Sequence, residues 1–106
     1  MREIKFRAWN EEIKRMFYWE IKDAVSFNNG WKNIIIMQYA GLKDCKGKEI
    51  YEGDIVKLLP YHIKGIITYD QGVLAVRERG FTHYLNEYNI EIVGNIYENP
   101  KLIKEI

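Results

Sequence analysis

The chain has 106 residues, a length typical of one domain with one hydrophobic core. Hydrophobic residues make up 47% and charged residues 29%, an ordinary globular composition that argues against intrinsic disorder. The net charge of +1, with acidic and basic residues interspersed, disfavours a protein that binds nucleic acid through a large basic excess. A local basic patch remains compatible with this balance.

Cysteine usage and the first residues of the chain indicate a cytoplasmic protein. The single cysteine, Cys45, cannot form an internal disulfide framework and suits a reducing compartment. The opening segment MREIKFRAW alternates charged and apolar residues and lacks the apolar core of a signal peptide. Nor does the chain contain an apolar run of about 18 residues, the length expected of a membrane-spanning helix. We therefore expect a cytoplasmic protein that does not involve a membrane.

The first twenty residues predict a β-hairpin. Residues 2–8 alternate polar and apolar side chains, the period of a strand with one buried face. A polar turn begins at Asn10, and the aromatic segment 15–20 follows it as a second strand. Residues 16–19 read Met-Phe-Tyr-Trp, so both faces of this hairpin are apolar. We expect one face to pack on the protein's own core and the other to be covered by the rest of the chain, another subunit or a partner.

The rest of the chain predicts short strands separated by turns. The predicted strands are residues 34–39, 54–59, 62–69, 73–77 and 90–97, of which the first is expected to be buried. Pro60 ends the second of them because it lacks the ladder N–H, and Gly65 marks a bulge or a close approach of the backbone. Residues 81–89 leave room for one helical turn, and Asn99 before Pro100 predicts the start of a short C-terminal helix. The pattern predicts a small antiparallel barrel or roll.

The stretch QYAGLKDCKGKEIYEGDIV, residues 38–56, contains acids, bases and a thiol, but its spacing is that of turns. Gly41, Gly47 and Gly53 lack the GK[ST] run of a phosphate-binding loop and are interpreted as turn glycines. Asp54 is expected to accept hydrogen bonds from backbone N–H groups in its turn, a structural role. The stretch is therefore interpreted as a fold signature.

Catalytic and metal-binding signatures are missing from the sequence. Cys45 has lysines near it, but His62 and His83 do not form a recognised Cys/His motif with it, which favours an incidental exposed thiol. The same three residues also lack the spacing of zinc ligands. The acidic residues of 38–56 lack the alternating pattern of a calcium loop. We therefore predict a non-enzymatic protein without a metal or cofactor.

Aromatic side chains with neighbouring cations form the candidate binding surface. The candidate residues are Arg7, Trp9, Arg15, Tyr18, Trp19, Trp31 and Lys32. Small barrels bind single-stranded nucleic acid by stacking bases on exposed aromatic rings beside a basic groove. The alternative is that some of these residues are core and that protein covers the hairpin, and this alternative is favoured. A cluster of Arg7, Arg15, Lys32, Lys57 and Lys64 around a tryptophan would favour nucleic acid, whereas dispersed charge beside an apolar patch would favour protein.

Three blocks follow one another along nearly the whole chain. They are REIKFRAW at residues 2–9, MQYAGLKD and GKEIYEGDIV at residues 37–44 and 47–56, and VGNIYENP at residues 93–100. Together these blocks resemble the YopX family of phage proteins. The resemblance implies a bacteriophage or prophage protein with an SH3-like β-roll core, and it implies no catalytic residues.

The chain departs from the family pattern at two places. Ala40 stands where the family usually has threonine, and Cys45 with Lys46 stands where the family has Lys-Asn. The missing hydroxyl and the variable thiol both argue against a catalytic role for these positions. We expect a single domain, residues 1–106, with a hairpin region at about 1–36 and the SH3-like core at about 37–106.

The favoured function is a phage-encoded accessory protein that acts as a non-catalytic protein-interaction module. Its expected partner is an unknown protein or a second copy of the chain in a homo-oligomer. The alternative is a nucleic-acid-binding protein in phage replication or regulation.

Overall fold

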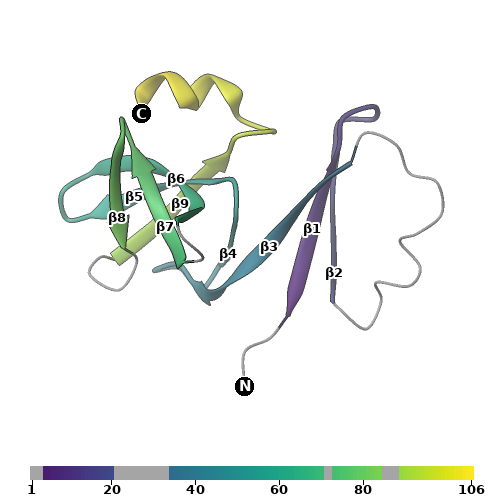
Figure 1. Cartoon of the computed structure of the whole chain (residues 1–106), viewed down its shortest axis with the longest axis horizontal. Helices are drawn as coiled ribbons and strands as arrows, with labels where there is room; N and C mark the ends of the chain where they lie inside the picture. The colour runs from purple at the N-terminus through teal and green to yellow at the C-terminus, as the bar shows by residue number, and fades with distance from the viewer. Residues whose placement is uncertain (1–3, 21–33, 71–72, 85–88) are drawn as a thin grey trace.

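The protein consists of two antiparallel β-sheets connected by successive strands (Figure 1). The computed structural model describes residues 4–20, 34–70, 73–84 and 89–106. The first sheet has the order β2-β1-β3-β4 and the second the order β8-β7-β6-β5-β9. The first sheet contains β1 (Lys5–Asn10), β2 (Arg15–Glu20), β3 (Ile34–Lys43) and β4 (Glu49–Tyr51). The second contains β5 (Asp54–Leu59), β6 (Ile63–Asp70), β7 (Val73–Glu78), β8 (Phe81–Tyr84) and β9 (Asn89–Asn95), and a 3-10 helix, Pro100–Glu105, follows it.

This architecture confirms the predicted fold class. The second sheet curls into a half-barrel, the core of a small antiparallel SH3-like roll, and the β1–β2 hairpin stands beside it. The 3-10 helix is the predicted short C-terminal helix, and Leu102 packs it against β9 at Gly94, where an added Cβ would lie 3.0 Å from Leu102 Cδ1. The division of the chain at about residue 36 stays a prediction, and β3 runs across that position.

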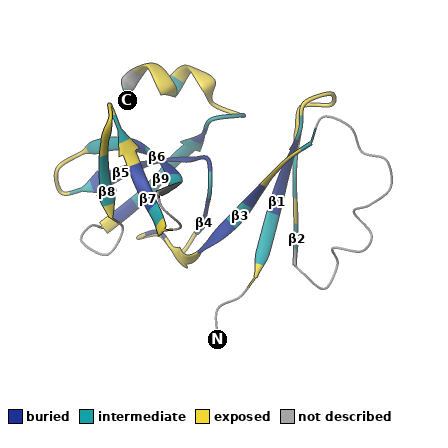
Figure 2. Cartoon of the chain, viewed as in Figure 1, coloured by how far each residue is buried: buried dark blue, intermediate teal, exposed yellow. Residues whose placement is uncertain are grey.

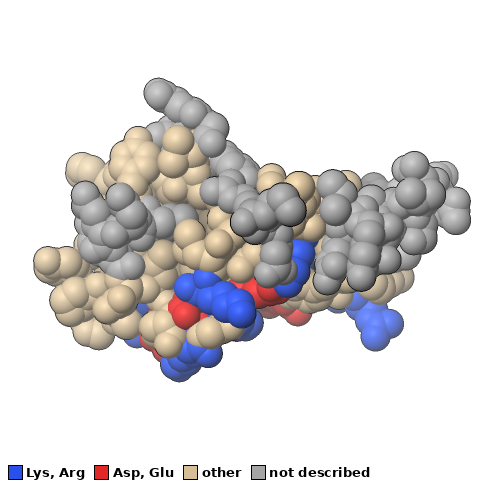
Figure 3. Space-filling model, turned by 90° about the horizontal axis from the view of Figure 1, so that it is seen from below, with Lys and Arg blue, Asp and Glu red and all other residues tan. Residues whose placement is uncertain are grey.

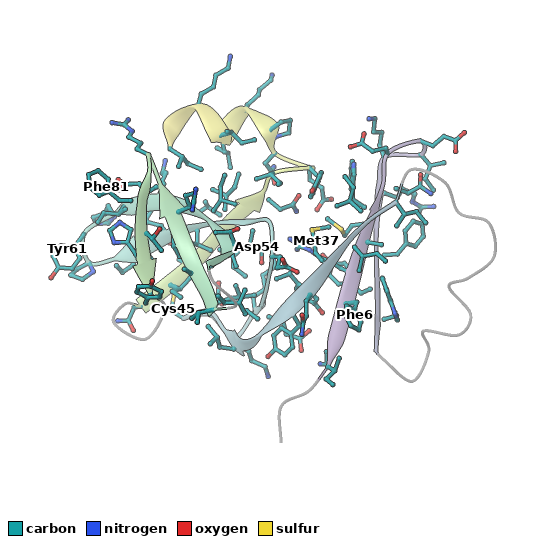
Figure 4. All side chains as sticks on the ribbon, viewed as in Figure 1. Phe6, Met37, Cys45, Asp54, Tyr61 and Phe81 are labelled. Carbon is teal, nitrogen blue, oxygen red and sulfur yellow. The ribbon has the colours of Figure 1, made fainter. Side chains whose placement is uncertain are left out.

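The hairpin sheet has one face toward the second sheet and one away from it. Arg7 on β1 is opposite Tyr18 on β2 and Met37 on β3, which places these three side chains on the same face. Met37 and Asp54 lie between the two sheets, whereas Phe6, the neighbour of Arg7 on β1, lies outside that space (Figure 4). The predicted hairpin is therefore confirmed, and it packs on the roll through its Arg7 face.

The hydrophobic core fills the inside of the half-barrel. Its buried members are Ala40, Ile50, Val56, Leu58, Ile67, Val76 and Ile90. Ala40 and Ile50 come from β3 and β4, so these two strands close the open side of the curled sheet (Figure 2). Burying an aliphatic side chain of this size contributes about 1.5–3 kcal/mol, which makes this cluster the main source of stability.

Gly65 confirms the predicted close approach of the backbone. A Cβ at this position would lie 2.3 Å from Val76 Cγ1 and 2.8 Å from the Arg77 carbonyl oxygen. No side chain fits there without moving β7, so β6 and β7 need glycine at this position.

The structure adds detail to the sequence prediction at three places. The segment 81–89, predicted to leave room for a helical turn, begins with the strand β8, because its aromatic and β-branched residues pair with β7, and residues 85–88 of this segment lie outside the described residues. The strand expected to be buried is exposed at Ile35 and Ile36, which lie on the part of β3 that extends beyond the roll. The C-terminal helix begins where predicted, with Asn99 at the N-cap position and Pro100 in its first turn, although Asn99 Oδ1 accepts a hydrogen bond from the Asn95 N–H at 3.1 Å and not from the helix.

Among the residues that the structure describes, no helix is long and apolar enough to span a membrane.

Candidate functional site

The two sheets meet at a polar junction that is built around Arg7 and Asp54. Arg7 projects from β1, and Asp54 begins β5 directly after the turn at Gly53. Arg7 Nη2 lies 2.8 Å from Asp54 Oδ1 and donates a hydrogen bond to the Glu52 carbonyl oxygen at 2.9 Å. Both charged side chains are almost completely buried. The pair therefore connects the hairpin to the roll from the inside of the protein.

Hydrogen bonds and burial shift the pKa of Asp54 in opposite directions. Its Oδ2 accepts a hydrogen bond from the Tyr51 N–H at 2.8 Å. Burial raises the pKa of Asp54, and although Arg7 and the Tyr51 N–H lower it, the pKa stays above its usual value. The Arg7 guanidinium also lies 5.0 Å from the centre of the Tyr51 ring, a cation–π distance. All of these contacts hold the turn in place, and a chemical role is not needed to explain them.

Aromatic pairs between the hairpin and the rest of the fold lie around the ion pair. Trp9 stacks on Tyr97 with ring centres 5.9 Å apart, and Tyr18 meets Tyr51 edge-on at 5.5 Å. Lys5 forms an ion pair with Glu49 at the rim. Because β1 and β2 provide one member of each pair and the rest of the fold provides the other, these contacts fix the hairpin against the roll.

A cavity of about 260 Å³ lies beside this junction. Its charged lining side chains are Arg7, Lys48, Glu49, Asp54 and Glu98. Four of these already have partners, because Glu49 pairs with Lys5, Arg7 and Asp54 pair with each other, and Glu98 accepts a hydrogen bond from Asn95 Nδ2 at 2.7 Å. The mixed lining has no excess of one charge that would select an anion or a cation. Across the described part of the chain, no group of three His, Cys, Asp or Glu side chains is placed to hold a metal ion.

The stretch 38–56 contains a second structural carboxylate, Asp44. Its Oδ1 accepts hydrogen bonds from the N–H groups of Lys46 and Lys48 at 2.9 and 2.8 Å, and its Oδ2 accepts one from the Ile92 N–H at 3.0 Å. Burial raises the pKa of Asp44, but these three bonds outweigh it and hold the pKa below its usual value. Asp44 therefore fastens its own turn to β9. Cys45 beside it is exposed and free.

The glycines of this stretch have left-handed backbone conformations. Gly47 and Gly53 have φ of +82° and +84° in tight turns, where glycine avoids the strain of a Cβ. Gly41, with φ of +86°, lies inside β3 where the register to β4 shifts, so it belongs to an irregularity of the strand and not to a turn.

The structure separates the predicted binding residues. Arg7 and Trp9 are buried at the junction, so the expectation that they could form an exposed stacking surface is wrong: they pack on the roll. Arg15 and Tyr18 are exposed, and Trp19 stacks on Phe6 at 5.7 Å on the opposite face of the hairpin. A binding role for these three stays a prediction. Trp31 and Lys32 lie outside the described residues.

Pattern analysis missed the pairing of Arg7 with Asp54. The available signal was the position of Arg7 between apolar residues of the strand, on the same face as Trp9. That position indicates burial, but it does not identify a partner far along the chain.

The charged side chains that are visible from below the molecule are mixed in sign. Blue and red atoms lie side by side in Figure 3. Ion pairs also bring opposite charges together on the surface, as between Lys46 and Glu91 at 2.8 Å. The view therefore shows acids next to the cations of this face.

The fold has a counterpart among solved structures. The crystal structure of protein EF1440 from Enterococcus faecalis is similar to this chain with a TM-score of 0.65 and 23% sequence identity. The likeness covers 97% of this chain and 99% of that one, and at this identity it concerns the fold alone. Comparison with curated proteins gives no match.

Sequence comparison identifies the family. The family model described as YopX protein matches residues 21–104. This range contains the blocks 37–56 and 93–100 that carried most of the resemblance, while the block at 2–9 precedes it. The chain belongs to the YopX family.

Proposed function

We propose that this chain is a phage-encoded accessory protein that acts as a non-catalytic protein-interaction module in the bacterial cytoplasm. The resemblance of its sequence blocks to a phage family supports the phage origin. The single cysteine is compatible with a reducing compartment. The binding surface that we assign is the outer hairpin face, the side of β1, β2 and β3 that points away from the roll.

The observation that carries this proposal is the exposure of Ile36. On the outer hairpin face, Ile36 lies opposite Ala8, which is fully buried, and Ala8 lies opposite the half-buried Phe17, so Ile36 is the exposed end of an apolar row across three strands. Ile36 is 59% exposed, and Ile4 at the edge of the same face is 44% exposed. Exposed apolar side chains that adjoin other apolar side chains on one face mark a protein-binding surface.

The acidic residues support a structural and not a catalytic interpretation. Asp44 and Asp54 direct their carboxylate oxygens to backbone N–H groups and to Arg7. These contacts stabilise the turns on either side of β4. A carboxylate that acts as a general acid or base needs access to a substrate, which these buried groups do not offer.

Analytical ultracentrifugation with a matched pair of variants tests the proposal. Ile36→Lys places a charge on the outer hairpin face, whereas Ile13→Lys places the same charge on the β1–β2 turn, where Ile13 is 52% exposed. We expect the wild-type chain and Ile13→Lys to self-associate as concentration rises and Ile36→Lys to stay monomeric. If the wild type is monomeric, the same three proteins are used for affinity capture of a partner. A defined partner that is captured by the wild type and by Ile13→Lys, but not by Ile36→Lys, also supports the surface. A monomeric wild type, together with equal capture by both variants, would overturn the proposal.

A further inference from the structure

The cavity at the junction of the hairpin and the roll has walls that are already held in place. Its volume is about 260 Å³. This is far more than the roughly 10–15 Å³ that one water needs and less than the roughly 300–1,000 Å³ of sites for drug-sized ligands. Arg7 and Asp54 on its wall neutralise each other as a buried pair, and Glu49 is paired with Lys5. The cavity therefore suits a small molecule.

Two further charged side chains on the lining lack a counterion. Within the described ranges of the chain, no ion pair involves Lys48 or Glu98. Glu98 accepts its hydrogen bond from the Asn95 side-chain amide, which is neutral and therefore leaves the negative charge of the carboxylate uncompensated. One positive and one negative side chain on the same small cavity match a ligand that carries both charges.

The cavity wall also contains a hydrogen-bond donor that is not satisfied. Arg7 Nε is buried, and no hydrogen-bond partner for it lies among the residues that the structure describes. Burial raises the pKa of Asp54, whereas the charges of Arg7 and, less strongly, Lys48 lower it, so both cations lie near this carboxylate. A buried N–H without an acceptor is costly, and a ligand oxygen beside it would relieve that cost. Arg7 and Lys48 together therefore favour a carboxylate group on the ligand.

The remaining lining is partly apolar. Tyr18, which is 58% exposed, meets the buried Tyr51 edge-on, and Ile92 of β9 also lines the cavity. An aromatic ring with an aliphatic neighbour offers contact area to an apolar or aromatic group. The ligand is thus expected to carry such a group beside its two charges.

We propose that this cavity binds a free α-amino acid with an apolar or aromatic side chain. The ligand carboxylate contacts Lys48 and the Arg7 Nε–H. Its ammonium group contacts Glu98, and its side chain lies against Tyr18. A simple anion would leave Glu98 without a counterion, and a simple cation would leave Lys48 without one. The inference goes beyond the proposed function and does not depend on it, because Arg7 and Tyr18 lie on the opposite face of the hairpin from Ile36.

Nuclear magnetic resonance titration of the isotope-labelled chain with L-phenylalanine tests this site. A ligand concentration of about 10 mM nearly saturates a site with a Kd of about 1 mM. We expect saturable shifts of the backbone amides of Gly94, Asn95 and Glu98, which line the cavity. Phenylpropionate lacks the ammonium group and phenethylamine lacks the carboxylate, so each should bind more weakly by about 5-fold or more, the effect of one lost ion pair. This comparison needs only the wild-type chain.

Two matched pairs of variants locate the ligand charges. Lys48→Gln is compared with Lys101→Gln at an exposed position of the 3-10 helix. Glu98→Gln is compared with Glu12→Gln in the exposed β1–β2 turn, and glutamine at position 98 keeps an oxygen for the Asn95 amide. We expect each cavity variant to weaken binding of L-phenylalanine by about 5-fold and each control to leave it unchanged.

The ligand analogues assign each charge to its side chain. Lys48→Gln should not weaken binding of phenethylamine, which has no carboxylate, and Glu98→Gln should not weaken binding of phenylpropionate, which has no ammonium group. Absence of saturable shifts with both L-phenylalanine and L-leucine, or shifts only at amides away from the cavity, would overturn the proposal. So would equal affinities for L-phenylalanine and its two analogues, or equal effects of the cavity variants and their controls.

Discussion

Arg7 and Asp54 form a buried ion pair in which Arg7 Nη2 lies 2.8 Å from Asp54 Oδ1 and the two side chains are only 4% and 3% exposed. One residue lies on the first strand of the hairpin and the other begins the first strand of the roll. The attraction of such a pair is offset by the cost of removing both charges from water, so the pair specifies how the hairpin docks more than it adds stability. Removing only one of the two side chains leaves the other charge buried without its partner, which is strongly destabilising.

We predict that Arg7→Met destabilises the protein by about 3–5 kcal/mol, because it leaves the Asp54 carboxylate buried without its cation. Urea denaturation followed by circular dichroism measures this change. Arg15→Met, at an exposed position of β2, is the control and should change the free energy of unfolding by less than about 0.5 kcal/mol.

The double variant Arg7→Met/Asp54→Asn tests whether the two residues contribute to stability as a coupled pair. Asparagine keeps an oxygen that can accept the Tyr51 N–H, so the double variant should be more stable than the sum of the two single changes implies. Additive effects within about 0.5 kcal/mol would show that the two residues are not coupled.

A second prediction concerns acid stability and Asp44. Its pKa is lower in the folded protein than in the unfolded chain, so Asp44 contributes stability above its unfolded pKa and loses it as pH falls through the lower folded value. Asp44→Asn should cost about 1–3 kcal/mol at neutral pH, since asparagine cannot accept all three backbone N–H bonds. The difference between wild type and Asp44→Asn should shrink as pH falls from about 5 to about 2, and urea melts across this range measure it. A difference that stays constant with pH would contradict the ionised role of Asp44.

A third prediction concerns alkaline stability and Tyr51. Burial first, and then the charge of Glu49, raises the pKa of Tyr51 to about 12. In the unfolded chain tyrosine ionises near pH 10, so the stability that Tyr51 contributes is complete below about pH 10 and is lost as pH rises toward 12. Between about pH 10 and about pH 12, the free energy of unfolding should therefore fall by up to about 2 kcal/mol less in Tyr51→Phe than in the wild type. Ultraviolet absorbance should also show a phenolate that titrates near pH 12 in the wild type and is missing from Tyr51→Phe, and equal late titration in both proteins would contradict the assignment.

The fourth prediction concerns Gly65. Gly65→Ala should cost about 1–3 kcal/mol, because its Cβ would overlap Val76 Cγ1 and the Arg77 carbonyl oxygen. Gly47→Ala is the comparison, since nothing lies within 4 Å of its Cβ position and only its φ of +82° opposes a side chain. In Gly65→Ala/Val76→Ala the contact with Val76 is removed, so the double variant should be more stable than the sum of the single changes. If thermal unfolding shows that the stability losses of the two single changes simply add, the Arg77 carbonyl oxygen, and not Val76, is the group that excludes a Cβ at position 65.

Most of the strands could be located along the chain from local patterns. Period-two alternation identified β1, and runs of branched and aromatic residues bounded by Pro60 or glycine identified β5 and β6. The strand β8 was missed because a four-residue strand is too short to show a period. β8 forms because β7 offers it an edge with which to pair.

The candidate site was less predictable than the fold. Turn chemistry correctly indicated that Asp54 accepts a backbone N–H, since this bond spans three residues. Its ion pair with Arg7 was missed, because sequence patterns carry no information about which distant charges meet. For the same reason the hairpin aromatics were grouped as one surface, although alternation places Trp9 against the roll and Trp19 on the opposite face.

The sequence by itself determined the family, the mainly β class, the hairpin and the turns at Gly47 and Gly53, because each depends on residues that are close in the chain. The tertiary structure decided what depends on distant segments: the burial of Arg7 against Asp54, the closure of the core by β3 and β4, and the alignment of Lys57 with Lys64 and Arg77. Cross-strand register brings these groups together, and register is set by the packing of the whole sheet.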